Sequence, residues 1–240
     1  CKMVNSATPP VEWLLSQGDA WVQAQTRQHL LGQPGDHPDV RAARVVMLAD
    51  PRLHALIEEL LQWPGEPLAR HNQAGHPLHR LVFLATIGLR RDDPGVDSII
   101  NRVLMHQHAD GPFQILVRPW RRGDRAEDSE GGVLTWALCD APLVLWAMCM
   151  LGADEKPALV RAAEHLTGLI RGNGWPCAAG EGYGANFRGP GRKGDPCPYA
   201  TLLALRALAA YGSDRLPDSS SVDIGIETLL YHWEAQTAGK

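Results

Sequence analysis

Side chains able to do chemistry precede three apolar segments of the chain. His76 and His79 surround Pro77-Leu78, Cys139-Asp140 stand ahead of Pro142, and Asp195-Pro196-Cys197 stands directly before Pro198. Imidazole, thiol and carboxylate groups are the usual acids, bases, nucleophiles and metal ligands of proteins. Short polar residues followed by proline are also typical of helix N-termini. The pattern therefore predicts either a functional site built from helix starts or a set of helix caps.

The two histidines His76 and His79 lie one turn apart if the segment from Pro77 onward is helical. Such a pair could work as acid and base or bind a metal ion. Single histidines on helix faces are also commonly buried groups that bond to the protein itself. We take His76, His79 and Asp140 as the candidate catalytic residues, with core and capping roles as the alternative.

Cys177 and Cys197 bracket the glycine-rich segment 178–196. Long segments without regular structure are unusual in compact domains and are often functional. Glycine N–H groups can approach an anion closely, and cationic side chains can bind a diphosphate. The candidate anion-binding side chains in this segment are Arg188, Arg192 and Lys193, with Tyr183 beside them. A solvated loop held by two buried cysteines, or a Cys177–Cys197 disulfide, remains the alternative.

Apolar spacing of 3.6 residues predicts an almost wholly helical chain. The expected helices are 10–31, 38–49, 52–63, 77–89, 95–108, 134–151, 156–171, 198–211 and 221–236. Pro38, Pro51, Pro77, Pro157 and Pro198 mark helix starts, and Gly88, Gly152 and Gly212 mark helix ends. No segment shows the alternation that predicts a strand.

The predicted helices pair into hairpins that recur about every sixty residues. Trp63, Phe113, Trp175 and Trp233 lie in turn-like contexts near the end of each second helix. Because repeated hairpins must stack to bury their apolar faces, they form a solenoid or a ring. Helices 134–151 and 198–211 are apolar almost all round, which predicts an inner layer, whereas 95–108 and 156–171 carry a polar face. We expect one all-α domain over 1–240, with an N-terminal helical extension over 1–36 and hairpins over 37–240.

This organisation resembles the α/α toroid of terpene cyclases and protein prenyltransferase β subunits. The likeness covers residues 38–236 and rests on the motifs Asp110-Gly111-Pro112-Phe113, Asn173-Gly174-Trp175-Pro176 and the segment 197–205, Cys-Pro-Tyr-Ala-Thr-Leu-Leu-Ala-Leu. About four hairpins are present against about six in the family ring, so the resemblance implies an incomplete α/α toroid. In such a ring the N-termini of the inner helices gather at one mouth, which favours anions.

The resemblance also implies a metal site. Asp195 and Cys197, followed by Tyr199, are similar to the Asp-x-Cys zinc pair of protein prenyltransferases, and Tyr199 would then contact substrate. The third ligand of the family, a histidine on a later helix, has no counterpart, and Cys177, His76 or His79 would replace it. The alternative is that Asp195 caps the helix while Cys197 packs beneath it.

Three hypotheses about function follow. The first is a prenyltransferase-like or cyclase-like protein that holds an apolar, isoprenoid substrate in a channel between inner helices, with zinc and with Arg188, Arg192 and Lys193 on the diphosphate. The second is a non-catalytic arc that binds a protein partner or a second copy of itself. A third is that the domain is one part of an enzyme completed by another chain.

Composition excludes several classes of function. The formal net charge is -4 and the basic residues are scattered, which argues against a nucleic-acid surface. The longest apolar stretches are shorter than the roughly 20 residues of a membrane span. Five cysteines at irregular spacing do not make a disulfide framework, and we expect a cytoplasmic protein.

Overall fold

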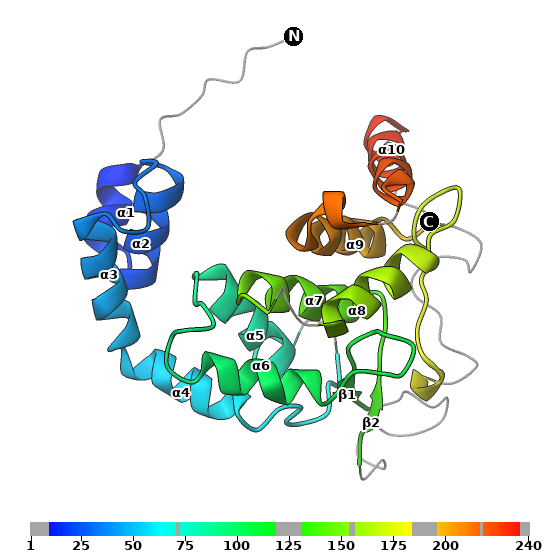
Figure 1. The fold of residues 1–240 in the computed structure, drawn as a ribbon, viewed down its shortest axis with the longest axis horizontal. Helices are drawn as coiled ribbons and strands as arrows, with labels where there is room; N and C mark the ends of the chain where they lie inside the picture. The colour runs from blue at the N-terminus through cyan, green and yellow to red at the C-terminus, as the bar shows by residue number, and fades with distance from the viewer. Residues whose placement is uncertain are drawn as a thin grey trace. The chain divides into compact units, whose positions relative to one another are not determined.

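The computed structural model describes residues 10–70, 73–118, 131–153, 157–183, 196–216 and 218–235. The chain divides into two compact units, Cys1–Leu56 and Ile57–Lys240. Helices make up most of both units, and one two-stranded sheet lies in the second (Figure 1). The predicted helical class is therefore confirmed, while the toroidal arrangement stays a prediction. None of the helices in the described ranges is long and apolar enough to cross a membrane.

The first unit contains α1 (Val11–Gln17), α2 (Ala20–His29), α3 (Pro38–Leu48) and the start of α4 (Pro51–Leu60), which continues into the second. The single helix predicted over 10–31 is wrong, because the chain breaks at Gly18. A Cβ on Gly18 would lie 2.4 Å from the carbonyl oxygen of Leu14 and 2.8 Å from Cγ1 of Val22. Only glycine permits this close turn between α1 and α2.

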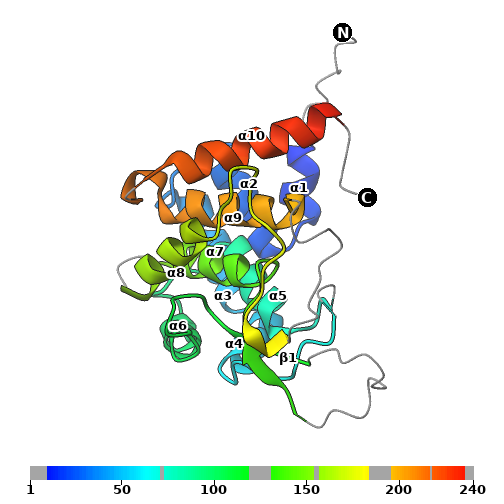
Figure 2. The ribbon, with the colours of Figure 1, turned by 90° about the vertical axis from the view of Figure 1, so that its right-hand side faces the viewer.

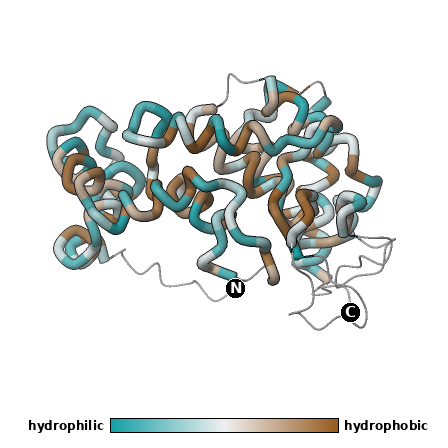
Figure 3. The backbone as a smooth tube through the Cα atoms, turned by 90° about the horizontal axis from the view of Figure 1, so that it is seen from below, coloured by the Kyte–Doolittle hydropathy of each residue, from teal (hydrophilic) through white to brown (hydrophobic). Residues whose placement is uncertain are grey.

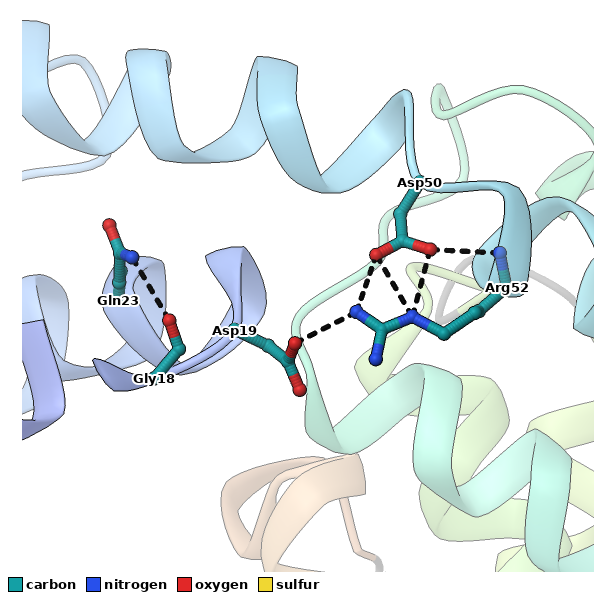
Figure 4. Close-up of polar contacts among 5 residues, drawn as sticks. All are labelled: Gly18, Asp19, Gln23, Asp50 and Arg52. Carbon is teal, nitrogen blue, oxygen red and sulfur yellow. Dashed lines mark hydrogen bonds and ion pairs between the residues drawn. The ribbon is translucent and has the colours of Figure 1, made fainter. Parts of the chain in front are cut away.

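Arg52 holds the turn between α3 and α4 to the start of α2 (Figure 4). Its guanidinium lies 2.7 Å from Oδ2 of Asp50 and 2.8 Å from Oδ1 of Asp19, and its backbone N–H donates to Oδ1 of Asp50 at 2.8 Å. Nearby, Nε2 of Gln23 donates to the carbonyl of Gly18 at 3.0 Å. Because Arg52 is well exposed, these ion pairs orient the helices more than they stabilise them.

The second unit contains α5 (Pro77–Thr86), α6 (Val96–Leu104), α7 (Ala141–Met150), α8 (Pro157–Gly168), α9 (Pro198–Tyr211) and α10 (Ser220–Ala235). Short 3-10 turns lie between α8 and α9, at η1 (Glu181–Tyr183), and between α9 and α10, at η2 (Ser213–Arg215). The predicted prolines stand at the first positions of α5, α8 and α9. Gly88, Gly152 and Gly212 follow α5, α7 and α9 with positive φ angles of 84°, 84° and 101°. The predicted start and stop signals are therefore confirmed.

Helix α7 lies between α5 and α9, with α8 packed against α7 and α9, and α10 packed against α9 (Figure 2). Residues 141–148 of α7 are all buried, as its uniformly apolar sequence predicts. By contrast, α6 buries only one face, made of Val96, Ile99, Ile100 and Val103. Figure 3 shows hydrophobic and hydrophilic residues mixed along the helical turns, as amphipathic helices require.

The helix predicted over 134–151 starts too early. Strand β2 (Val133–Thr135) pairs antiparallel with β1 (Ile115–Val117), with Leu116 opposite Leu134, and α7 begins only at Ala141. The expectation of no strands is therefore wrong. These strands of three residues are too short to show a two-residue alternation, although β1 buries its first and last side chains.

Two of the predicted glycine–aromatic turns pack closely against a later helix, α8 for one turn and α10 for the other. A Cβ on Gly111 would lie 2.3 Å from the carbonyl oxygen of Arg161 on α8, and one on Gly174 would lie 2.8 Å from Cγ2 of Thr228 on α10. The aromatic residues of these turns, Phe113 and Trp175, are buried, as is Trp63. Trp233 differs, because it lies within α10 and is 82% exposed.

Candidate functional site

Asp140 is a buried carboxylate at the start of α7. It precedes the helix, but its side chain makes no capping hydrogen bond. Instead, Oδ2 accepts a hydrogen bond from the hydroxyl of Tyr183 at 3.2 Å and from the thiol of Cys139 at 3.6 Å. The capping interpretation therefore does not describe Asp140. Its negative charge also lies at the end of α7 where the helix dipole favours anions.

Tyr183 reaches Asp140 because segment 178–183 pairs with the chain that follows β2. The N–H of Gly180 donates to the carbonyl of Trp136 at 2.8 Å. The N–H of Leu138 donates to the carbonyl of Ala178 at 2.9 Å. A Cβ on Gly180 would lie 2.8 Å from Oγ1 of Thr135. The segment thus lies against the strand at a distance that a side chain at Gly180 would prevent.

Both donors to Asp140 are neutral groups. Burial, and next the charge of Asp140, raise the pKa of Tyr183 and of Cys139 above their usual ranges. At neutral pH each therefore keeps the proton that it donates to the carboxylate. The site is a buried carboxylate held by two protonated neighbours.

His76 caps α5, as the alternative interpretation predicted. Its Nδ1 accepts the N–H of Leu78 at 3.1 Å, so Nε2 carries the proton and donates to the carbonyl of Glu66 at 3.0 Å. Burial is the main reason that the pKa of His76 is lowered. With both nitrogens bonded to backbone, His76 acts on a ligand only if one of these bonds breaks. His79, one turn further on, is half-buried, and its proximity also acts to lower the pKa of His76.

Cys177 and Cys197 form a pair of interacting thiols at the start of α9. A hydrogen bond from Cys177 lowers the pKa of Cys197 to about 6, and Sγ of Cys197 accepts the N–H of Ala200 at 3.5 Å. The backbone segments that carry the two cysteines are hydrogen-bonded to each other. Pro176 pairs antiparallel with Pro196, and the N–H of Cys197 donates to the carbonyl of Trp175 at 2.7 Å. Both cysteines are thiols, so the disulfide alternative is not the state observed.

The thiols of Cys177 and Cys197 lie close enough to Asp140 and its hydrogen-bond partners for their charges to affect common neighbours. Burial first, and then the charges of Cys139, Asp140 and Cys197, raise the pKa of Tyr199. The charge of Cys197 also contributes to the raised pKa of Cys139. The charge of Asp140 acts to raise the pKa of His76, against the larger effect of burial. We call this set the helix-start cluster, and its members are His76, His79, Cys139, Asp140, Cys177, Tyr183, Cys197 and Tyr199. Arg188, Arg192, Lys193 and Asp195 lie outside the described residues.

The predicted zinc site is not supplied by the residues that the structure describes. Among them, no group of three or more His, Cys, Asp or Glu side chains is placed to hold a metal ion. The thiols of Cys177 and Cys197 alone are fewer than the ligands that zinc requires, and His76 uses both nitrogens elsewhere. The assignment with Asp195 stays a prediction, and no chemistry is derived from it.

Exposed apolar side chains lie on the helices that carry the cluster. Phe83 on α5, Met150 on α7 and Leu202 on α9 are 37%, 48% and 53% exposed. On α9, Tyr199, Leu202 and Arg206 share one face because they are three and four residues apart. The guanidinium of Arg206 lies 3.7 Å from the ring centre of Trp146 on α7. Tyr199 and Leu202 are therefore exposed apolar side chains on α9 next to the cluster, and the cationic Arg206 follows them on the same face.

No protein-family model, curated protein or solved structure matches this chain. Its function is therefore inferred from the cluster and from the exposed Tyr199 and Leu202 beside it.

Proposed function

We propose that residues 57–240 form an arc of an α/α toroid that binds an elongated apolar substrate of isoprenoid type, with its polar end at the helix-start cluster. One observation carries this proposal. Asp140 is fully buried at a helix start, makes no cap, and bonds to Tyr183 from a segment bracketed by Cys177 and Cys197. Burying a carboxylate is costly, and one held at a helix start by hydrogen bonds from Tyr183 and Cys139 is therefore a candidate for function.

The order of packing supports the toroidal part of the proposal. Helices α5, α7 and α9, the first helices of consecutive hairpins, lie side by side, and the second helices α8 and α10 pack against them. Their N-terminal residues His76, Asp140 and Cys197 all belong to the cluster. This is the gathering of helix starts that an inner layer of parallel helices would produce.

The proposed chemistry is general acid–base catalysis. The carboxylate of Asp140 would accept a proton from the substrate, and the neutral hydroxyl of Tyr183 would orient that carboxylate through its hydrogen bond. Cys197, at the N-terminal end of α9, would supply a sulfur that attacks or contacts the substrate. The helix starts favour an anionic group of the substrate, such as a diphosphate. The apolar chain would then lie along Tyr199 and Leu202.

Binding of farnesyl diphosphate tests this proposal by calorimetry, with farnesol and inorganic diphosphate as partial ligands. Replacing Leu202 by Asp puts a charge on the proposed binding face, and we expect at least a tenfold loss of affinity, corresponding to about 1.4 kcal/mol. Val160→Asp on α8 is the matched control, because Val160 is also an exposed apolar residue, at 39%. Equal affinity in both variants, or no binding by the unsubstituted protein, would count against the proposal.

A second function is favoured by a different surface. Ile226, Leu230 and Trp233 are 45%, 55% and 82% exposed and share one face of α10. Such a stripe fits a protein partner or a second copy of the chain. A concentration-dependent dimer in sedimentation equilibrium that Trp233→Ser and Leu230→Ser abolish would support self-association. A monomer at all concentrations, with no binding partner, would oppose this function.

A further inference from the structure

We propose that the turn 108–113 is an acid-sensitive contact, which is closed on α8 at neutral pH and opens when His165 takes up a proton. This inference does not rest on the proposed function, because it concerns the contact between that turn and α8 and needs no bound ligand.

The turn 108–113 is packed closely against α8. A Cβ on Gly111 would lie 2.3 Å from the carbonyl oxygen of Arg161, so the two backbones touch at this point. Gln107, just before the turn, donates from Nε2 to the carbonyl of Gly111 at 2.5 Å and to the carbonyl of Ala158 at 2.7 Å. Its Oε1 accepts a hydrogen bond from Nη2 of Arg161 at 2.6 Å. The closed position of the turn therefore depends on a small number of bonds to α8.

A small cavity lies beside this contact. Its wall consists of Pro112 and Phe113 from the turn, the chain between β2 and α7, the start of α7, and one face of α8 that includes His165. The cavity measures about 10 Å³, which is room for a single water molecule. A charged group facing this space could not keep a hydration shell.

His165 places one ring nitrogen against these apolar surroundings. Its Nε2 is buried and has no hydrogen-bond partner among the residues that the structure describes. Its ring packs edge-on against Trp136, with the ring centres 4.7 Å apart. A neutral imidazole tolerates this position because only one of its two nitrogens carries a proton. A protonated ring would place a charge and an N–H donor where no acceptor is available, which is costly.

The charges around His165 oppose its protonation in the closed form less than burial does. Burial is the main reason that its pKa is lowered, while the charge of Asp110 acts to raise the pKa and the charge of His108 to lower it. The carboxylate of Asp110 lies 3.4 Å from Nδ1 of His108 in the turn. Arg161 and Glu164 precede His165 on α8, and the walls from α7 and from the chain after β2 are uncharged.

These pKa directions fix the sign of the response. Because opening exposes the ring of His165 to water, the open form binds a proton more readily than the closed form does. Below about pH 6.5, the usual pKa of histidine, the opening constant should rise by up to tenfold per pH unit. The rise should level off once the closed form is protonated too. Acid would thereby uncover Phe113 and the apolar wall that continues to the start of α7.

Hydrogen exchange on the native protein, followed by mass spectrometry between pH 7.5 and 5.5, tests this inference. After correction for the intrinsic effect of pH on exchange, we expect opening of residues 106–114 to increase at least fivefold from pH 6.5 to 5.5. Peptides of α9 should keep their protection. His165→Phe keeps an aromatic ring against Trp136 but cannot titrate, so its opening should not depend on pH in this range. His108→Gln is the matched control and should keep the dependence.

A second measurement avoids substitution of the buried ring. NMR titration of the histidine ring signals in the unsubstituted protein should give His165 a midpoint below that of an ordinary histidine. A midpoint at or above the ordinary value would overturn the inference. So would an equal pH dependence in His165→Phe, a dependence that His108→Gln abolishes, or a rise in exchange that is uniform along the chain. These readouts require no isoprenoid, so their failure would leave the proposed function standing.

Discussion

The hydroxyl of Tyr183 donates a hydrogen bond of 3.2 Å to Oδ2 of Asp140, across 43 residues of sequence. The bond joins the glycine-rich segment to the start of α7. It exists because Gly180 and Gly182 let the backbone of that segment approach Thr135. The position of the hydroxyl therefore depends on glycines that never touch the carboxylate.

Gly182→Ala should separate Tyr183 from Asp140. A Cβ on Gly182 would lie 2.7 Å from Cβ of Thr135 and 2.9 Å from Cγ1 of Val133, so the segment must lift away. We expect a loss of about 1–3 kcal/mol in the free energy of unfolding, measured with urea. Gly172→Ala is the control, since nothing lies within 4 Å of its new Cβ.

A double-mutant cycle shows whether that loss passes through the hydrogen bond. Tyr183→Phe should destabilise the unsubstituted protein but add little to Gly182→Ala, because the bond is already broken there. Fully additive losses would show that Gly182 supports some other contact.

Gly174→Ala should loosen the docking of the second glycine–aromatic turn on α10. Gly174 has a φ of +101°, and its Cβ would lie 2.8 Å from Cγ2 of Thr228. Backbone strain and overpacking together predict a loss of about 2–4 kcal/mol. Gly168→Ala, at the end of α8 with open space around it, should be neutral or slightly stabilising. Similar stabilities for the two variants, by thermal and urea denaturation, would contradict this account of how the repeats stack.

The sequence predicted the helices better than the contacts between them. Proline and glycine signals located the starts and ends of α5, α7, α8 and α9 closely, apart from the early start of α7, because these signals act locally. Polar residues before Pro77, Pro142 and Pro198 predicted that His76, Asp140 and Cys197 would each stand at a helix start, although the predicted helix 134–151 placed Asp140 inside it. Their gathering in one cluster is what stacked hairpins produce.

The remaining features depend on pairing between distant residues. The hairpin of β1 and β2 has too few residues for a periodic signal, and the break at Gly18 is a steric effect of Leu14 and Val22. Tyr183 was predicted to contact a substrate, but its bond to Asp140 follows from the pairing of 178–183 with the chain after β2. The two glycines that surround Glu181 were the only local hint of that close approach.

His76 should make stability depend on pH below about 6.5, the usual pKa of histidine. Burial lowers the pKa of His76 in the folded chain, so the unfolded chain takes up the proton first and stability falls as pH falls. His76→Asn keeps a cap for α5 but loses the bond to Glu66, a cost of about 1 kcal/mol at pH 8. That cost should shrink as pH falls to 5. Parallel stability curves for the two proteins, measured by urea denaturation at each pH, would refute this role.

Photo-crosslinking tests the central claim most directly. The probe is a farnesyl diphosphate analogue with a diazirine near the apolar end of its chain, and labelled peptides are mapped after irradiation of the native protein. We expect labelling on the Tyr199–Arg206 face of α9, competition by farnesyl diphosphate, and weaker labelling in Leu202→Asp but not in Val160→Asp. Labelling confined to the Ile226–Trp233 face of α10, or labelling that the competitor does not reduce, would contradict the claim that the helix-start cluster is a substrate site.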